Sequence, residues 1–494
     1  MAKHLKAAAL ALGVSAFPLL FASSAHADTP VIGPVSVYGT IDVGVAYQSA
    51  GVGVNGATGV EYQAWTTTRN FGGSQTMVSE NALEYSRLGI KINQPVTRDV
   101  TVIGQAEAWI NPLSGSLMDS CKSIAQNAGV PDAKQNGTFD SAGCGQAFSR
   151  GLFAGIASKT YGTLTFGRQN APLMALIASY DPQGGAPAFS FLGYSGAVGG
   201  AGTTEASRWN NAIRYVYAKG PVHFAAEFAG KSADTGMPGT AFGFSAGGTL
   251  GGLSLDVVYQ KENAAINLRS SDDNALNPLT NTAGAGNGGD IWNSVNQPGL
   301  SAYLSKDTSI SVVGKYEMAT ANKSKLTLYA GFSHFEKAAA INNYYGIAGY
   351  SAGGYLAAID LEITGTAKYD MEWIGARFTT QSKLTVSAAF YNAHQNNWAV
   401  ALTTPGTAGL SGVAAGQSLG CGAAGLLCAG SFHEASLVVD KPLFKYVDVY
   451  AGVNWSQVTN GLAWGYPGNQ AGGGVGTTGK QAQTTLATGI RIKF

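Results

Sequence analysis

Alternation between apolar and polar residues is the most consistent pattern along this chain. From Val35 to Gln48, the odd positions carry mostly valine, isoleucine and tyrosine, while the even positions carry mostly small or polar residues. The last segment, which ends at Phe494, alternates in the same way. Successive side chains of a strand point to opposite faces, so a period of two predicts β-strands. We therefore expect an all-β fold.

Segments of this kind recur about sixteen times. Most could run for roughly 9–11 residues, which is the length of a tilted membrane-spanning strand. The pattern is weakest at residues 163–168 and 243–250. The predicted strand centres are Ile41, Gly89, Gly104, Phe153, Thr165, Ile213, Ala226, Ser245, Val257, Val313, Ala330, Gly375, Ala388, Leu437, Ala451 and Thr488.

Short and long connections alternate between these segments. Short turns at one end and long loops at the other are the plan of an outer-membrane β-barrel, with periplasmic turns and extracellular loops. The outer face of such a barrel meets lipid, and closure pairs every strand edge. A soluble sandwich or secreted β-solenoid is the alternative, but long loops are uncommon in compact soluble domains. The expected long loops are residues 49–80, 111–146, 169–207, 263–298, 336–370, 395–430 and 459–480, with a much shorter one at 230–238.

The first 27 residues have the features of a secretory signal peptide. Two lysines near the start precede an apolar stretch at residues 7–21, and the tripeptide Ala-His-Ala stands at 25–27. This order of charge, apolar stretch and small-residue cleavage site is typical of export signals. The apolar stretch is shorter than the roughly 20 residues that a membrane-spanning helix needs. We expect a signal peptide at residues 1–27 and a single barrel domain at 28–494.

Composition supports this interpretation and excludes others. The chain has 68 glycines in 494 residues, and 12% of its residues are charged. Disordered proteins combine low hydrophobicity with high net charge, whereas this chain is 45% hydrophobic with a net charge of +1. Nucleic-acid binding is not expected either, because such proteins normally show a basic excess or stripe.

Signals for catalysis and cofactor binding are weak. Residues 284–289 match a G-x-G-x-x-G string, but they lie in a glycine- and asparagine-rich stretch without the strand and helix that a dinucleotide site requires. The six histidines show no close pair at metal-ligand spacing. Nothing resembles the nucleophile elbow of serine hydrolases. We expect no enzyme activity, no cofactor and no metal site.

A series of short motifs resembles the Gram-negative general porins of the sixteen-stranded type. Their order and spacing along the chain carry the resemblance, which covers essentially the whole of residues 28–494. The motifs are VYGTIDVGVAY (37–47), SRLGIK (86–91), SRGLFAG (149–155), YGTLTFGRQ (161–169), NNAIRYVYA (210–218), GKYEM (314–318), IGARF (374–378) and TGIRIKF (488–494).

This resemblance implies a homotrimer in the outer membrane, in contact with lipid and lipopolysaccharide, in which each barrel has its own pore. It implies that Phe494 is the terminal signal for barrel insertion. It also implies that the third long loop, residues 169–207, folds inward and narrows the channel. That loop departs from the family pattern, because its acids are limited to Asp181 and Glu205 and it carries an apolar group at Phe189, Phe191, Leu192 and Tyr194.

The resemblance further implies a basic wall opposite the inward loop. By motif, Arg87, Arg150 and Arg208 match the arginines of the constriction. The alternative is that these arginines only solvate a wet lumen or pair with loop acids. Further pore-lining candidates are Lys91, Arg168, Arg214, Asp181 and Glu205.

The expected function is passive diffusion of ions and small hydrophilic solutes with a modest anion preference. Size exclusion and charge at a narrow wet constriction would do the sorting. One alternative is a channel dedicated to one substrate class, such as sugars or organic anions, which aromatic side chains on the inward loop would favour. The other is a barrel that mainly presents its loops as an adhesin or receptor surface.

The four cysteines generate a first testable prediction. Cys121 and Cys144 share one long loop, and Cys421 and Cys428 share another. Export implies an oxidising compartment, in which disulfides form. We expect mass spectrometry of the unreduced protein to find Cys121 linked to Cys144 and Cys421 linked to Cys428, with no thiol open to labelling. A link between the two loops would contradict the local pairing.

Overall fold

The computed structural model describes residues 29–49, 74–117, 146–194, 208–232, 239–271, 299–338, 350–352, 355–359, 366–397, 429–460 and 479–494. The expected signal peptide, the four cysteines and Glu205 lie outside the described residues. None of the helices in the described part of the chain is long and apolar enough to cross a membrane.

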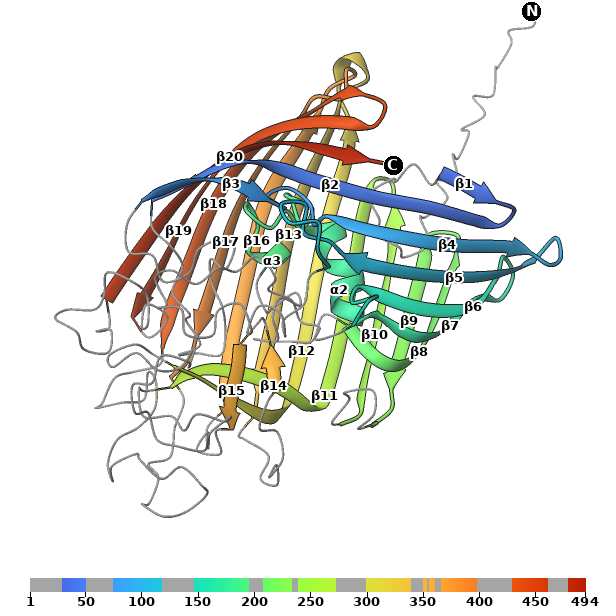
Figure 1. Cartoon of the computed structure of the whole chain (residues 1–494), viewed down its shortest axis with the longest axis horizontal. Coiled ribbons are helices and arrows are strands. Elements are labelled where there is room, and N and C mark those ends of the chain that lie inside the picture. The colour runs from blue at the N-terminus through green and yellow to red at the C-terminus, as the bar shows by residue number, and fades with distance from the viewer. Residues whose placement is uncertain are drawn as a thin grey trace, which may run out of the picture.

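The described residues form a closed antiparallel barrel with sixteen strand positions (Figure 1). Neighbouring strands pair in chain order, and β2 closes the barrel by pairing with β20. One position is shared, because β3 and β4 both pair with β2, one after the other. The strands are β2 (Val35–Gln48), β3 (Gln75–Glu80), β4 (Arg87–Pro95), β5 (Val100–Trp109), β6 (Gly151–Ser158), β7 (Gly162–Asn170), β8 (Arg208–Lys219), β9 (Val222–Ala229), β10 (Ala241–Leu250), β11 (Leu253–Ser271), β12 (Gly299–Ala319), β13 (Lys325–Lys337), β16 (Ala367–Thr379), β17 (Thr385–Gln395), β18 (Gly430–Phe444), β19 (Val447–Asn460) and β20 (Gly479–Lys493).

Three short strands lie outside this count. β1 (Thr29–Ile32) pairs with the first residues of β2. β14 (Tyr350–Ala352) and β15 (Tyr355–Ile359) form a hairpin, and β15 also makes a short parallel pairing with β12.

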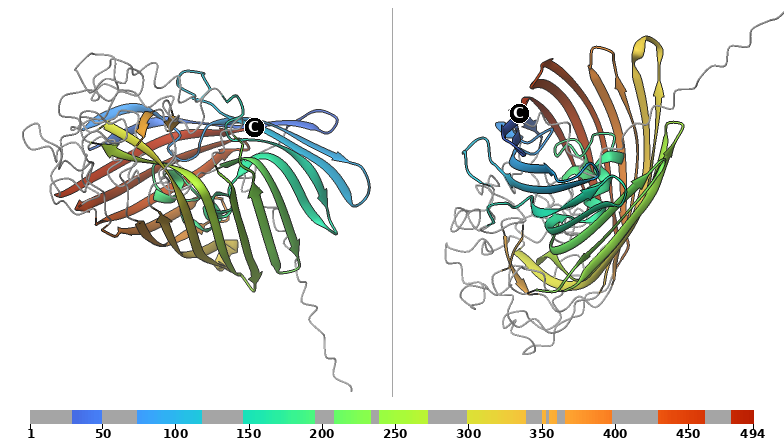
Figure 2. Two further views of the ribbon diagram at one scale, coloured as in Figure 1. Left: turned by 90° about the horizontal axis from the view of Figure 1, so that it is seen from below. Right: turned by 90° about the vertical axis from the view of Figure 1, so that its right-hand side faces the viewer.

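The predicted strand order is confirmed, because each of the sixteen predicted centres falls in a different barrel position. The predicted lengths are wrong for one side of the barrel: β11 has 19 residues, β12 has 21, and β18 and β20 have 15 each. By contrast, β6 and β9 have eight residues each, and Figure 2 shows the strands of both sides curving around the interior. Residues 75–80, 263–271 and 350–359, which lie in the expected long loops, contain strands.

The two faces of the wall differ in polarity as the alternation requires. Outward side chains such as Ile90, Phe244 and Ile374 are apolar and exposed on the outer face. Inward positions carry hydroxyls and charges, such as Ser311 and Ser333, whose side chains hydrogen bond across β12 and β13 at 2.7 Å. Because lipid surrounds a barrel of this kind and water fills it, this polarity is the reverse of a soluble domain.

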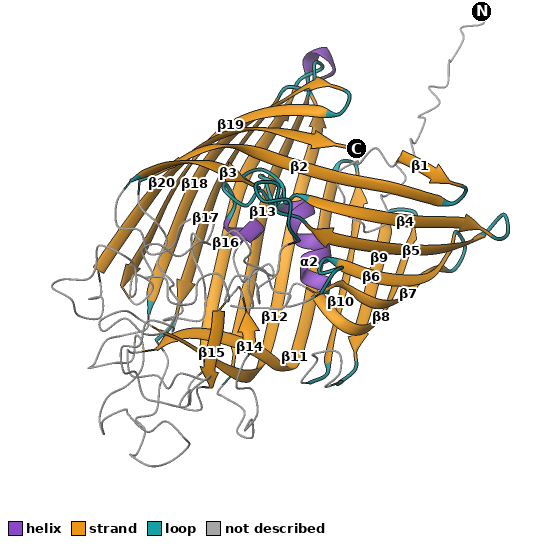
Figure 3. Ribbon diagram, in the orientation of Figure 1, coloured by secondary structure: helices purple, strands orange, loops and turns teal. Residues whose placement is uncertain are grey.

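The third long loop folds into the barrel, as expected, in its described part (Figure 3). It contains α2 (Pro172–Ile177), the 3-10 turn η2 (Ala178–Tyr180) and α3 (Phe191–Tyr194). The backbone N–H of Leu173 donates to Gln260 Oε1 on β11 at 2.9 Å. The Tyr180 hydroxyl donates to Asp256, also on β11, and burial raises the pKa of Tyr180 above its usual range, which keeps that donor protonated. The first half of the loop is thereby fixed to the wall.

The second half of the loop is held by buried acceptors and by aromatic packing. Tyr391 donates its hydroxyl to Asp181 at 2.5 Å, and the N–H of Phe191 donates to Glu434 at 3.1 Å. Phe189 is fully buried against Gly452, where an added Cβ would lie 2.6 Å from its ring. The apolar group of this loop therefore anchors it, since Phe189, Phe191 and Leu192 are all buried. The rings of Phe189 and Phe191 are therefore not open to a solute in the lumen.

A second inward segment, which the sequence did not predict, interrupts the wall between β3 and β4. We call residues 81–86 the inner shelf. The N–H groups of Leu83 and Glu84 donate to Asp42 Oδ2 at 2.8 and 2.7 Å, and Tyr450 donates its hydroxyl to Asp42 Oδ1 at 2.5 Å. The N–H of Ala188 donates to the carbonyl of Ala82 at 3.0 Å, so the inner shelf touches the inward loop.

Asp42 should be critical for the stability of the inner shelf. Replacing it by alanine leaves two backbone N–H groups and the Tyr450 hydroxyl without this acceptor. A buried polar group left unsatisfied costs roughly 1–3 kcal/mol, so we expect Asp42→Ala to lower the free energy of unfolding by about 3 kcal/mol or more. Thermal unfolding of the detergent-refolded protein, followed by circular dichroism, measures this. Asp42→Asn, which keeps a carbonyl acceptor, should lose less, and an unchanged melting temperature for the alanine variant would contradict the argument.

Candidate functional site

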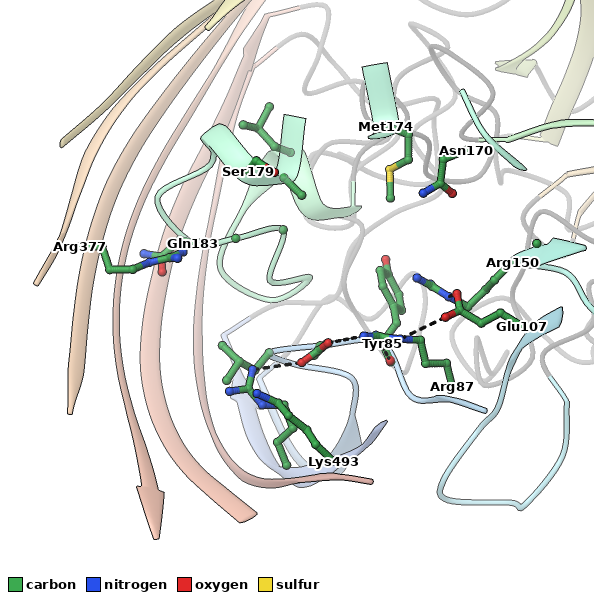
Figure 4. A pocket seen from close by; sticks show the side chains of 18 of the residues that line it. Tyr85, Arg87, Glu107, Arg150, Asn170, Met174, Ser179, Gln183, Arg377 and Lys493 are labelled. Carbon is green, nitrogen blue, oxygen red and sulfur yellow. Dashed lines mark hydrogen bonds and ion pairs between the residues drawn. The ribbon is translucent and has the colours of Figure 1, made fainter. Parts of the chain in front are cut away.

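The lumen holds a cavity of about 650 Å³ bounded by the inner shelf, the inward loop and the barrel wall. Figure 4 shows Tyr85, Arg87, Glu107 and Arg150 on one side of this space, with Asn170 and Met174 across from them. Ser179 and Gln183 of the inward loop face it from another side. The two inward segments thus leave a cavity of molecular size inside the barrel, lined largely by polar and charged side chains.

Basic side chains outnumber acidic ones along the lining of this cavity. Eight basic residues face four acidic residues, which is a formal excess of four positive charges. The basic residues are Arg87, Arg150, Arg214, Lys315, Lys325, Arg377, Arg491 and Lys493, and the acidic residues are Glu84, Glu107, Glu317 and Asp440.

Arg87 and Arg150 line the cavity, but both are paired with acids. Glu107 lies 2.5 Å from Arg150 Nε through Oε1 and 3.5 Å from Arg87 Nε through Oε2. Arg87 Nη2 also lies 2.6 Å from Glu84 Oε1 on the inner shelf. Tyr38 donates its hydroxyl to Glu107 at 2.8 Å. The structure therefore brings these two predicted arginines together around a carboxylate that the sequence analysis did not single out.

Arg208 is placed differently from the other two. Its side chain is buried, it donates through Nε to the backbone carbonyl of Arg150 at 2.6 Å, and its guanidinium lies 5.0 Å from the Trp109 ring. It is not among the residues that line the cavity in the described part of the chain. Arg208 thus supports Arg150 from behind.

Of the remaining candidates in the described residues, Arg214 lines the cavity, whereas Lys91, Arg168 and Asp181 do not. Arg214 Nε lies 3.8 Å from Glu227 Oε2. Arg168 donates to Asn210 Oδ1 at 2.6 Å, and Lys91 Nζ lies 4.2 Å from the centre of the Tyr38 ring. Asp181 is 1% exposed and fixes the inward loop, so its carboxylate is not offered to the lumen.

Five lining bases were missed by the sequence analysis: Lys315, Lys325, Arg377, Arg491 and Lys493. Four of them lie within motifs quoted for the family resemblance, at GKYEM, IGARF and TGIRIKF. Each stands on the inward face of its strand, so the alternation itself was a signal that could have identified them.

Acids near the end of the chain pair with two of these bases. Arg491 Nη2 lies 2.7 Å from both Asp440 and Asp448, and Lys493 Nζ lies 3.0 Å from Asp448. Arg491 Nη1 also lies 3.3 Å from Glu84 Oε2. Glu84 therefore joins Arg87 and Arg491 and connects the inner shelf to the last strand.

The site offers charge, hydroxyls and space. In the described residues, no group of three or more His, Cys, Asp or Glu side chains is arranged to hold a metal ion. The arrangement suits passage of a hydrated solute between fixed charges, because fixed charges and pore width sort solutes in such a passage.

Comparisons with known proteins agree with this architecture. A family model described as Gram-negative porin matches residues 7–461. The fold is similar to an anion-selective porin from Comamonas acidovorans, with a TM-score of 0.52 and 15% identity over 93% of this chain and 99% of that one. It is also similar to a loop L8 deletion mutant of OmpT, an outer membrane protein of Vibrio cholerae, with a TM-score of 0.50 and 12% identity over 93% of this chain and 99% of that one. A comparison with curated protein sequences found no match.

The motif series, the closed sixteen-position barrel with its inward loop, and a family match over most of the sequence together show that the chain belongs to the Gram-negative porin family.

Proposed function

We propose that the chain forms a water-filled outer-membrane channel through which ions and small hydrophilic solutes diffuse passively, with a modest preference for anions. The observation that carries this proposal is the lining of the cavity, with its eight bases and four acids. No catalytic step is part of the proposal, since pore width and fixed charge do the sorting.

The preference for anions should be modest, because the cavity has a formal excess of only four positive charges and water weakens their field. One unit charge about 6 Å from an ion contributes roughly 0.7–3 kcal/mol at an effective dielectric of 20–80. Salt near 0.15 M, with a Debye length of about 8 Å, screens this in part. The similar barrel from Comamonas acidovorans is named an anion-selective porin, and the excess positive charge here has the sign that such selectivity requires.

The proposed assembly is a homotrimer that reaches the outer membrane after cleavage of residues 1–27. Its apolar outer face would contact membrane lipid and lipopolysaccharide. The apolar exposed side chains of the wall support this, since they need a lipid or protein surface against them.

Planar-bilayer recording of the purified protein tests the channel itself. We expect stepwise conductance increments that appear and close in groups of three, because each barrel of a trimer encloses its own lumen. A protein that inserts but never conducts would overturn the channel and favour an adhesin or receptor barrel. Single, ungrouped steps would keep the channel and remove the trimer.

The reversal potential across a tenfold KCl gradient tests the anion preference. We expect an anion-selective parent, and we expect Arg150→Ser to lower the ratio of chloride to potassium permeability by about 1.5- to 3-fold, because one lining charge is lost whose field salt and the neighbouring Glu107 already reduce. Arg208→Ser is the matched control: its guanidinium lies behind Arg150, so its effect should be smaller. A cation-selective parent would refute the charge argument. An equal or larger effect of Arg208→Ser would refute the assignment of the lining residue.

A further inference from the structure

We propose that the inward faces of β12, β13 and β16 form a binding site for small divalent oxyanions, built by Lys315, Lys325 and Arg377. The proposal rests on the channel function above and names a substrate class for it. The site is separate from Arg87, which begins β4, and from Arg150, which directly precedes β6.

Strand register places the three cations on one patch of wall. Thr327 on β13 pairs with Glu317 on β12 and with Arg377 on β16, so these three form one row across the sheet. Lys315 lies in the row on one side of it, opposite Tyr329, and Lys325 lies in the row on the other side. Side chains opposite or diagonal to each other on one face of a sheet are close enough to interact. All of them line the cavity.

The charge of this patch is not balanced by carboxylates. Glu317 lies 3.4 Å from Lys325 Nζ and 4.0 Å from Lys315 Nζ, so one acid serves two lysines. Among the described residues, no ion pair joins Arg377 to a carboxylate, and its guanidinium donates instead to the carbonyl of Pro182. Arg87 and Arg150 differ, because Glu84 and Glu107 lie against them. The patch therefore supplies much of the positive excess of the lumen.

The lysines of the patch are also open to a passing solute. The side chain of Lys325 is 51% exposed and that of Lys315 is 24% exposed, whereas that of Arg87 is 6% exposed. An ammonium group has three N–H donors, and the contacts of these two lysines leave donors available. Neighbouring hydroxyls add further donors: Thr379 and Thr385 line the same cavity with their oxygens 3.2 Å apart.

Arg377 has a second role, which is to position the inward loop beside the patch. Its Nη2 and Nε donate to the Pro182 carbonyl at 2.6 and 3.1 Å, and Lys315 Nζ donates to the Ser179 carbonyl at 3.4 Å. Figure 4 shows Arg377 beside Gln183 at the edge of the cavity.

Because Lys325 begins β13 and Thr379 ends β16, the patch lies toward the short-turn end of the channel.

Such an arrangement suits a divalent oxyanion better than chloride. Two ammonium groups and hydroxyl donors can contact several oxygens at once, and charge-assisted hydrogen bonds are about twice as strong as neutral ones. Conduction needs binding that is favourable but weak enough for release. A water-exposed site with one nearby acid meets both conditions.

The test is a sulfate titration of chloride current through single channels at constant ionic strength and pH 7. We expect sulfate to reduce the parent's chloride current with saturation, and we expect the double variant Lys315→Gln/Lys325→Gln to weaken the apparent sulfate affinity about tenfold, since both charged donors are lost. Lys306→Gln is the matched control, because Lys306 lies on the same strand but faces outward and is exposed. It should titrate like the parent.

Lys325→Gln alone separates binding from movement of the loop. Lys325 forms its ion pair with Glu317 and not with the inward loop. Replacing the lysine should therefore weaken sulfate affinity without moving Pro182. The site is refuted if sulfate does not saturate the block, or if the double variant titrates like Lys306→Gln. The sign of the reversal potential in KCl tests the proposed anion preference independently of the sulfate site. If the parent is anion-selective but its block by sulfate does not depend on the two lysines, the site is refuted and the proposed function is not.

Discussion

The pairing of β2 with β20 is the constraint on which the rest of this molecule depends. Lipid offers no partners for backbone N–H and C=O groups, so a spanning sheet has to close on itself. Here the first long strand and the last meet over nine register pairs, from Thr40 opposite Lys493 to Gln48 opposite Thr485. Closure then fixes which face of every strand is inside, and the inside is where charge and water can gather.

A closed barrel of sixteen strand positions is too wide to be filled by its own wall side chains. The chain narrows it with backbone that returns into the lumen, and that backbone needs polar partners of its own. Asp42, Asp256 and Glu434 provide them from the wall, each accepting from the inner shelf or the inward loop. Many of the buried acids of this protein are therefore structural, and the charges left for solutes are largely basic.

The sequence predicted the wall well and the lumen poorly, for a physical reason. Alternation records which face a side chain occupies, so all sixteen strand positions could be found from local pattern. Alternation does not show how far a side chain reaches into the lumen or which groups it contacts there. Arg150 and Arg208 are both matched to the family's constriction, and both guanidinium groups lie near the Trp109 ring, yet Arg150 lines the cavity and Arg208 does not. The inner shelf was missed because it breaks the alternation, and its supports, Asp42 and Tyr450, are distant in sequence.

The two ion pairs of Glu84 depend on different stages of barrel formation. Glu84 contacts Arg87, three residues later in the chain, and Arg491, which belongs to the last strand. The first of these contacts can form as soon as that stretch of wall exists, whereas the second has to wait until β20 has docked on β2. A barrel that is still open between these two strands therefore lacks one of the ion pairs that hold its narrowest part, and the finished pore shape requires closure of the barrel.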